Sequence, residues 1–171
     1  MLTNVATTVH RDVFVGAMGS VATGVSIVST EGPAGRFAMT VSAFSSVSAE
    51  PPTVLACINR SSPLVDAIRR NGVFCVNVLG ANQSAIADRF AGRPRAGAAY
   101  DFNCATWGVL ATGSPRLIDA AAAFDCDFDS SVDHGTHLVI FGRVVAVADG
   151  PSPALVYARR NYGRPHLIAA E

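Results

Sequence analysis

The chain has no surplus of charge and little charge of either sign. Its 171 residues include 13 basic and 13 acidic side chains, so the formal net charge is zero, and only 15% of residues are charged. Proteins that bind nucleic acid or anionic membranes usually carry a basic surplus, so we expect neither partner. Hydrophobic residues make up 50% of the chain, which excludes the disordered class. The composition indicates a well-filled core, or a core together with a homodimer interface.

Long hydrophobic runs and targeting segments are also missing. Residues 1–12 contain no apolar run behind a basic end, so we expect no secretory signal. The longest apolar stretch, 138–148, is interrupted by Gly142 and Arg143 and is shorter than the roughly 20 apolar residues of a membrane span. The sequence therefore predicts a cytoplasmic protein without a membrane segment.

Several motifs of catalysis and metal binding are absent. The four cysteines, Cys57, Cys75, Cys104 and Cys126, form no CxxC pair, which favours buried free thiols over disulfides or a metal site. His134 and His137 have no third ligand nearby at a fitting spacing, so we expect no metal. No P-loop, nucleophile elbow, HExxH or Rossmann glycine loop occurs, and a nicotinamide cofactor would have to bind in another way.

The pattern of apolar residues and turn signals predicts mainly extended structure. We expect helices over 8–18, with Thr8 as N-cap, over 62–72, with Ser62 as N-cap and Pro63 at the first helical position, and over 82–90. Strands are expected over 25–30, 36–48, 53–59, 73–79, 121–130 and 136–148, with a turn over 133–135 and a last short element over 153–162. Residues 1–171 are expected to form one barrel-like domain.

Alternation within two of these strands suggests faces of different character. Thr40, Ser42 and Ser46 fall in one row of the 36–48 strand, which can hydrogen-bond a planar heterocycle or a phosphate, although an ordinary solvent-facing strand looks the same. In 121–130 the apolar side chains alternate with aspartates. The sequence predicts that Asp125, Asp127 and Asp129 face water.

Each of three further segments is compatible with either a ligand-binding or a structural role. Residues 57–63 end a strand and begin a helix, whose free N–H groups suit a phosphate or are simply capped. Arg89 and Phe90 could hold a phosphate and a ring, or could end a helix beside the core. Tyr157 and Tyr162 flank Arg159 and Arg160, and these residues either cover a ligand or pack a tail.

The chain resembles the short-chain flavin reductase family over Phe14–Tyr162. The resemblance is carried by 14–18 with 23–28, by 39–48 followed by Pro51, Pro52, Val54 and Leu55, by 59–62, by 89–92, and by 135–137 with Gly142. The chain departs from the family pattern at Thr136, where many relatives have Asp, which weakens the case for a carboxylate that orients His137 and leaves the expected strand unchanged.

The resemblance implies a mainly β, Greek-key antiparallel, FMN-binding split β-barrel with short peripheral helices, which dimerises and holds flavin near the dimer interface. It implies reduction of FMN or FAD by NADH or NADPH through hydride transfer, which would supply a flavin-dependent oxygenase component. His137 would meet the nicotinamide, with Tyr162 as a second candidate. The implied flavin contacts are Thr40, Ser42 and Ala43 at the isoalloxazine edge, Ala56, Cys57 and Ile58 beneath the ring, Ser46, Ser61 and Ser62 at the phosphate, and Arg89 and Phe90 near the phosphate–ribose end.

Other functions are compatible with the same residues. A flavin-storage split barrel would bind flavin without hydride transfer, an oxidase of the pyridoxamine-phosphate type would want more basic residues around its phosphates, and a structural dimerisation module would need no hydroxyl row. The sequence leaves open the choice between FMN and FAD and the oxygenase partner. It also leaves open the choice between NADH and NADPH, although no arginine cluster along the chain marks a 2′-phosphate site.

Overall fold

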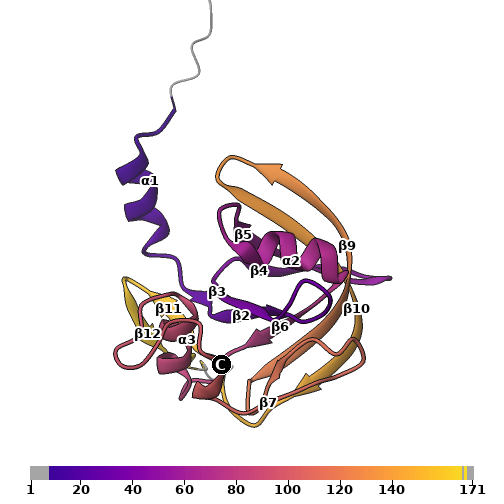
Figure 1. Cartoon of the computed structure of the whole chain (residues 1–171). Helices are drawn as coiled ribbons and strands as arrows, with labels where there is room; N and C mark the ends of the chain where they lie inside the picture. The colour runs from indigo at the N-terminus through magenta and orange to yellow at the C-terminus, as the bar shows by residue number, and fades with distance from the viewer. Residues whose placement is uncertain (1–7, 167, 169–171) are drawn as a thin grey trace, which may run out of the picture.

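The computed structural model describes residues 8–166 and 168, which form mainly antiparallel β-structure with three short helices at the periphery (Figure 1). The helices are α1 (Arg11–Met18), α2 (Pro63–Asn71) and α3 (Ser84–Phe90), with a 3-10 turn at Phe102–Cys104. The strands are β1 (Thr23–Gly24), β2 (Ser26–Thr30), β3 (Phe37–Val41), β4 (Phe44–Ala49), β5 (Pro52–Asn59), β6 (Val73–Val78), β7 (Trp107–Gly108), β8 (Arg116–Leu117), β9 (Ala122–His134), β10 (His137–Asp149), β11 (Val156–Ala158) and β12 (Asn161–Gly163). The predicted mainly β class is confirmed.

Seven strands form one sheet that curls on itself. Their order is β3-β2-β6-β9-β10-β5-β4, so β3 and β4 lie at opposite edges although only Ser42 and Ala43 separate them in the chain. A two-residue link reaches only a few ångströms, so the two edges must come together. At this junction the Cys57 amide of β5 donates to the Ala43 carbonyl over 2.9 Å. The sheet is therefore a barrel that closes at Ser42–Ala43.

This closure contradicts the expected single strand over 36–48. The chain leaves one sheet edge at Val41 and joins the other at Phe44, with a bend between them. Alternation along one strand cannot be carried across such a bend. Thr40, Ser42 and Ser46 therefore do not form one row, which corrects the prediction of a continuous hydroxyl face.

Helix α2 is built as its local sequence predicts. The Ser62 hydroxyl accepts from the Leu64 amide over 3.3 Å, and Pro63 occupies the first turn, where its missing N–H costs nothing. Gly72 ends the helix at φ 73° and donates its N–H to the Ile68 carbonyl over 2.8 Å. Leu64 and Ile68 are buried against the barrel, which stabilises the docking by about 1.5–3 kcal/mol for each large side chain.

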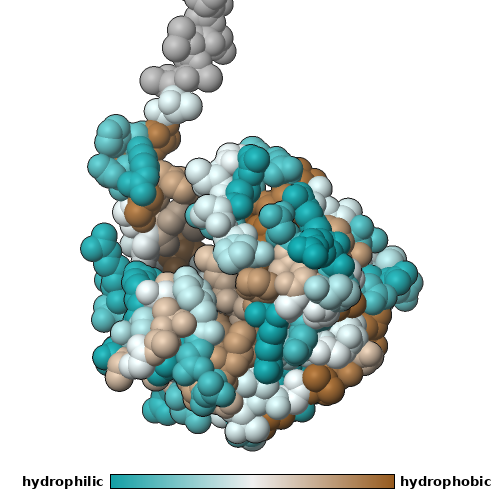
Figure 2. Space-filling model, viewed as in Figure 1, coloured by the Kyte–Doolittle hydropathy of each residue, from teal (hydrophilic) through white to brown (hydrophobic). Residues whose placement is uncertain are grey.

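Helix α1 differs from α2 in both its capping and its burial. It begins at Arg11, with His10 at the cap and no side-chain cap bond, so the prediction that Thr8 caps it is wrong. No residue of α1 is buried, and Val13 and Phe14 are 64% and 59% exposed. Figure 1 shows the helix standing away from the barrel, and Figure 2 shows apolar surface on it. The helix forms where the apolar periodicity predicts it, but its apolar side chains are not buried against any of the described residues.

The core has two parts. One lies between α2 and the inner face of the curled sheet and includes Phe74, Ile58 and Ile140, all without exposed surface. The other lies beneath α3 and includes Phe90 and Leu79, with Trp107 packed against them. The second cluster joins the loop after α3 to the barrel, so it positions the residues of the site described below.

The predicted water-facing row of aspartates is wrong for Asp125. Its side chain has no exposed surface, and its carboxylate accepts from the Thr112 amide (2.7 Å) and the Thr112 hydroxyl (2.5 Å). The loop before β8 folds over this part of β9 and supplies the donors that a buried carboxylate requires. Asp129 is exposed as predicted.

The structure also tests the predictions for the β9–β10 turn, the cysteines and a membrane segment. The β9–β10 hairpin turns at Gly135–Thr136, two residues between the paired His134 and His137, rather than over 133–135. All four cysteines are free, as predicted, but only Cys75 and Cys126 are buried. Burial raises the pKa of Cys126 to about 12 and also raises the pKa of Cys75. Among the described residues, none of the helices has the length and hydropathy of a membrane span.

Candidate functional site

Strand β5 and helix α2 meet at a short polar corner. The Asn59 side-chain oxygen accepts from both the amide (3.0 Å) and the hydroxyl (2.8 Å) of Ser61. The Ser62 hydroxyl caps α2, as described above. These bonds hold two hydroxyls beside the N-terminus of a helix, where the positive end of the dipole favours an anionic group.

A cavity of about 430 Å³ opens at this corner, and we call it the α2 cavity. It is mostly apolar, with amide and hydroxyl groups from Asn59, Ser61 and Ser62 and a charged group from Arg36. Its lining residues are Arg36, Phe37, Ala38, Met39, Asn59, Ser61, Ser62, Pro63, Leu64, Tyr100 and Phe102. An apolar pocket with a few convergent polar groups suits a planar organic ligand that carries a charged end.

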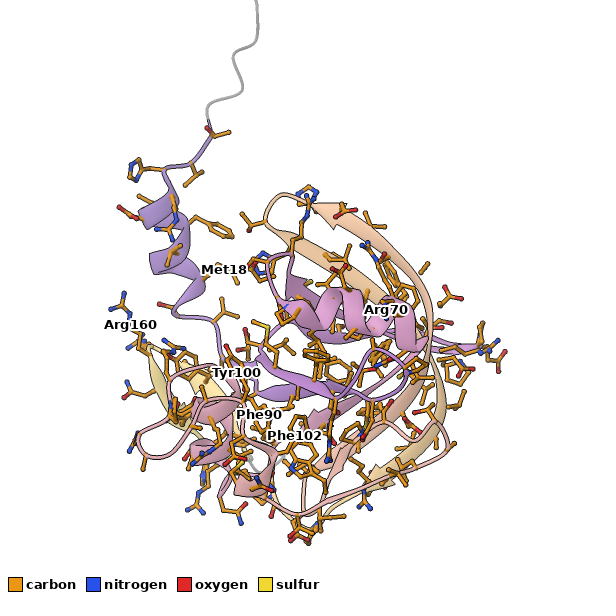
Figure 3. All side chains as sticks on the ribbon, in the orientation of Figure 1. Met18, Arg70, Phe90, Tyr100, Phe102 and Arg160 are labelled. Carbon is orange, nitrogen blue, oxygen red and sulfur yellow. The ribbon has the colours of Figure 1, made fainter. Side chains whose placement is uncertain are left out.

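Arg36 supplies a positive charge to this cavity that the sequence analysis missed. Its guanidinium carbon lies 4.3 Å from the centroid of the Phe102 ring, and its Nε lies 3.5 Å from a Glu31 carboxylate oxygen. Tyr100 beside it has φ 58° and is 52% exposed, an unfavourable backbone for a large side chain of the kind found at binding sites (Figure 3). Only the fold brings Arg36 and Phe102 together, so no local signal could identify the pair.

His137 lies at the edge of the same corner. It is the first residue of β10 and pairs with Asn59 of β5, which lines the α2 cavity. Its side chain is exposed, and its Nδ1 lies 2.9 Å from the Thr136 hydroxyl. This contact involves Nδ1 alone and leaves Nε2 outside it.

A second cavity, of about 160 Å³, lies further along β3, and we call it the tyrosine cavity. Its lining residues are Val25, Thr40, Val41, Ser42, Ala91, Arg93, Tyr157 and Tyr162. Met39 is the last β3 residue of the α2 cavity and Thr40 is the first of the tyrosine cavity, so one edge strand borders both. The Thr40 hydroxyl donates to the Ala87 carbonyl over 2.8 Å, which leaves it able only to accept from a ligand.

Two tyrosines form the wall of this second cavity. Tyr157 and Tyr162 are cross-strand partners on β11 and β12, with ring centroids 5.2 Å apart. The Tyr162 hydroxyl donates to Asp88 over 2.7 Å. Burial and this hydrogen bond raise the pKa of Tyr162 to about 12, so the phenol stays neutral and keeps donating. The pair is a fixed aromatic surface.

Arg89 and Phe90 lie in neither cavity. The Arg89 guanidinium donates to the Ala96 and Ala98 carbonyls, each over 2.8 Å, and lies 3.7 Å from Asp101. Phe90 has no exposed surface and packs edge-on against Phe102. Their side chains hold the loop after α3, in agreement with the structural interpretation of this segment. Their contact with a flavin stays a prediction.

The remaining predicted flavin contacts lie around the barrel closure. Ala43 is exposed at the junction and is hydrogen-bonded to Cys57, so the structure brings these two together. Ala56 and Ile58 are fully buried on the core side of β5, which leaves only half-buried Cys57 on the opposite face. Ser46 is exposed on β4, apart from both cavities.

Comparison with known proteins gives one consistent result. Residues 18–166 match the family model described as the flavin reductase like domain. The FMN reductase (NADH) RutF of Ancylobacter novellus is 40% identical over 165 residues, which cover 96% of this chain and 88% of that protein. The solved flavin reductase PheA2 is 28% identical with a TM-score of 0.84, covering 93% of this chain and all of that one. The styrene monooxygenase flavin reductase of Pseudomonas putida S12 is 29% identical with a TM-score of 0.78, covering 91% and 99%.

Proposed function

The chain belongs to the flavin reductase-like domain family, and we propose that it catalyses the reduction of FMN by NADH. The observation that carries the proposal is the corner of β5 and α2, where two hydroxyls, a helix N-terminus and Arg36 border an apolar cavity. His137 pairs with Asn59 of the cavity wall. The similar RutF protein is named as an NADH-dependent FMN reductase. The split-barrel fold that the resemblance implied is the fold of these solved reductases.

The protein's part in this reaction is positional. Nicotinamide and flavin themselves supply the chemistry, a hydride passing from one ring to the other. Ser61 and Ser62 would bind the flavin phosphate, and Ser42 and Ala43 would border the ring at the barrel closure. His137 would orient the nicotinamide by donating a hydrogen bond. Holding two rings in contact at fixed orientation removes most of the entropic cost of their encounter.

We further propose how the protein works in its setting. Residues 1–171 form one domain, and the protein is cytoplasmic. The reduced flavin passes to an oxygenase component, a proposal that the name of the similar styrene monooxygenase flavin reductase supports. The exposed apolar side chains of α1, among them Val13 and Phe14, support a homodimer in which α1 covers the partner. Light scattering of the wild type and of Phe14→Glu tests this, because a dimer that depends on α1 dissociates in the variant.

Anaerobic stopped-flow absorbance tests the central proposal. Purified protein is mixed with FMN or FAD and with NADH or NADPH, and the loss of the flavin absorbance is followed. We expect the fastest bleaching with FMN and NADH. Tight flavin binding without bleaching would instead establish the rival function, flavin storage.

A further inference from the structure

Four arginines without carboxylate partners gather around the tyrosine pair. All 13 basic residues of the chain are arginines, in a chain whose net charge is zero. Six of them lie within salt-bridge distance of a carboxylate: Arg11, Arg36, Arg60, Arg89, Arg95 and Arg143. Arg93, Arg159, Arg160 and Arg164 have no such partner among the residues that the structure describes. A neutral protein thus carries a local positive surface.

These four arginines line three adjoining cavities that share the tyrosines. Arg93 lines the tyrosine cavity itself. Arg159 and Arg160 line a neighbouring cavity that also contacts Tyr157, and Arg164 lines one that also contacts Tyr162. The Asp88 carboxylate accepts from the Tyr162 hydroxyl and lies 3.4 Å from Arg95. The charge around the rings is therefore available to an anion.

The backbone gives an independent indication that these arginines are functional. Arg159 and Arg160 form the two-residue turn between β11 and β12, with φ values of 49° and 63°. Positive φ at both positions is the type I′ pattern, which strongly prefers Asn and Gly. The Arg159 N–H donates to the Gly19 carbonyl over 2.6 Å and the Arg159 carbonyl accepts from Asn161 over 2.8 Å, bonds that any residue could make. The arginine side chains add no hydrogen bond to the turn among the described residues, and side chains that break a local preference in this way mark functional positions.

We propose that Arg93, Arg159, Arg160 and Arg164, together with Tyr157 and Tyr162, bind the adenosine diphosphate group of a dinucleotide. Guanidinium groups pair with phosphate oxygens in a bidentate manner, and a tyrosine ring offers a stacking surface for adenine. The inference rests on the proposed function, because nicotinamide dinucleotides and FAD share this group. Thr40 and Ser42 place the same cavity next to the barrel closure, where the ring chemistry is proposed.

Calorimetric titration with ADP tests the site without any turnover. The main variant is the double substitution Arg159→Asn with Arg160→Asn, since asparagine suits the turn and removes only the charge. Its matched control is Arg70→Asn, an exposed arginine on α2 far from the hairpin, which forms no ion pair with any residue that the structure describes (Figure 3). We expect ADP affinity to fall roughly tenfold or more in the double variant and to stay unchanged in the control. The melting temperature of the double variant should not decrease.

The inference is overturned if the wild type does not bind ADP, or if the double variant binds it as well as the wild type. Inhibition kinetics then identify the source of the group. ADP that competes with NADH while FMN is the flavin assigns the site to the nicotinamide dinucleotide, and competition only with FAD assigns it to the flavin. Arginine-dependent ADP binding that competes with neither overturns the assignment as a substrate site.

The same measurements separate this inference from the proposed function. A wild type that bleaches FMN while the arginine variants keep full ADP affinity retains the function and loses the site. A wild type that binds ADP through these arginines but never reduces flavin retains the site and loses the function.

Discussion

Two hairpins beside the candidate site, each with a two-residue turn, reverse the chain by opposite means. The β9–β10 hairpin turns at Gly135 and Thr136, and glycine takes the positive φ of 55°. The β11–β12 hairpin places arginine at both of its positive-φ positions. A side chain in this region costs roughly 1–2 kcal/mol that glycine avoids. In the β9–β10 hairpin the turn residues only reverse the chain, and the proposed functional side chain is the neighbouring His137. In the β11–β12 hairpin the turn residues themselves expose two positive charges.

The hairpins also differ in how they are held. Strand β10 passes through the core, where Gly142 lies against buried Phe74 and Cys126. The short β11–β12 hairpin lies at the surface, and Gly163 on β12 has only an ordinary neighbour, Val156. We therefore expect substitutions by larger side chains to be costly in the strands of the β9–β10 hairpin and to be tolerated in the strands of the β11–β12 hairpin.

We expect the largest effect from a substitution in the core part of the β9–β10 hairpin. In Gly142→Ala the added methyl would overlap the Phe74 ring and lie 2.8 Å from the Cys126 Cβ, and both neighbours are fixed in the core. We expect a loss of about 1–3 kcal/mol in the free energy of unfolding, measured by chemical denaturation. The matched Gly163→Ala, whose new methyl would lie 3.6 Å from Val156, should change it by less than about 0.5 kcal/mol. Equal losses would contradict the difference in anchoring.

The second effect tests the corner beside the first hairpin. Ser61→Ala combined with Ser62→Ala removes both hydroxyls proposed to bind phosphate, so FMN affinity should fall roughly tenfold or more while riboflavin affinity changes little. Fluorescence quenching measures both ligands. Loss of the Ser62 cap also lowers stability by about 1 kcal/mol, so titrations are made well below the melting temperature. Equal losses for FMN and riboflavin would argue against a phosphate site.

His137 sharpens the comparison by separating the two substrates. His137→Ala should raise the KM for NADH roughly tenfold, the loss of about one hydrogen bond, while the FMN dissociation constant stays unchanged. Steady-state kinetics and flavin titration measure the two quantities. The milder Thr136→Val removes only the hydroxyl beside Nδ1 and should have a smaller effect. Unchanged NADH kinetics in His137→Ala would remove this residue from the mechanism.

The smallest effect exchanges the turn chemistry of the hairpins. Arg160→Gly relieves the positive φ and should raise stability by about 0.5–1 kcal/mol, whereas Gly135→Ala should lower it by about 1 kcal/mol. Thermal unfolding of both variants checks the opposite signs. A destabilised Arg160→Gly would mean that the arginine holds the turn rather than a ligand.

The sequence predicts well those elements whose signals lie within their own residues. Helix α2 has its serine cap, its proline and its glycine end where expected, because each bond is made within a few residues. The strand over 53–59 and the antiparallel class follow from periodicity in the same way. Thr40, Ser42, Ser61, Ser62 and Tyr162 do line cavities. Arg89 and Phe90 do not, because their surroundings are set by a loop that closes over them from further along the chain.

The sequence predictions that were wrong or missed concern features that depend on residues distant in the chain. The 36–48 strand breaks because the barrel must close at Ser42–Ala43, and closure is a property of the whole seven-strand order. Asp125 is buried because Thr112 arrives with hydrogen-bond donors. Arg36 meets Phe102 across 66 positions of sequence, so neither residue indicates the other.

Caps, turns and alternation act over a few residues, so the chain's local signals are enough to predict the helix that presents Ser61 and Ser62 and the mainly β class. The family followed from the resemblance of several motifs along the chain. Only the tertiary structure decided which charges are paired and which are left free. Arg93 follows α3 and Arg159 belongs to a hairpin far along the chain. Both line cavities beside the tyrosines because β11 pairs with β1 and the Tyr162 hydroxyl donates to Asp88 of α3. Charge balance counted along a chain cannot show this, since electrostatic partners are set by distance in space.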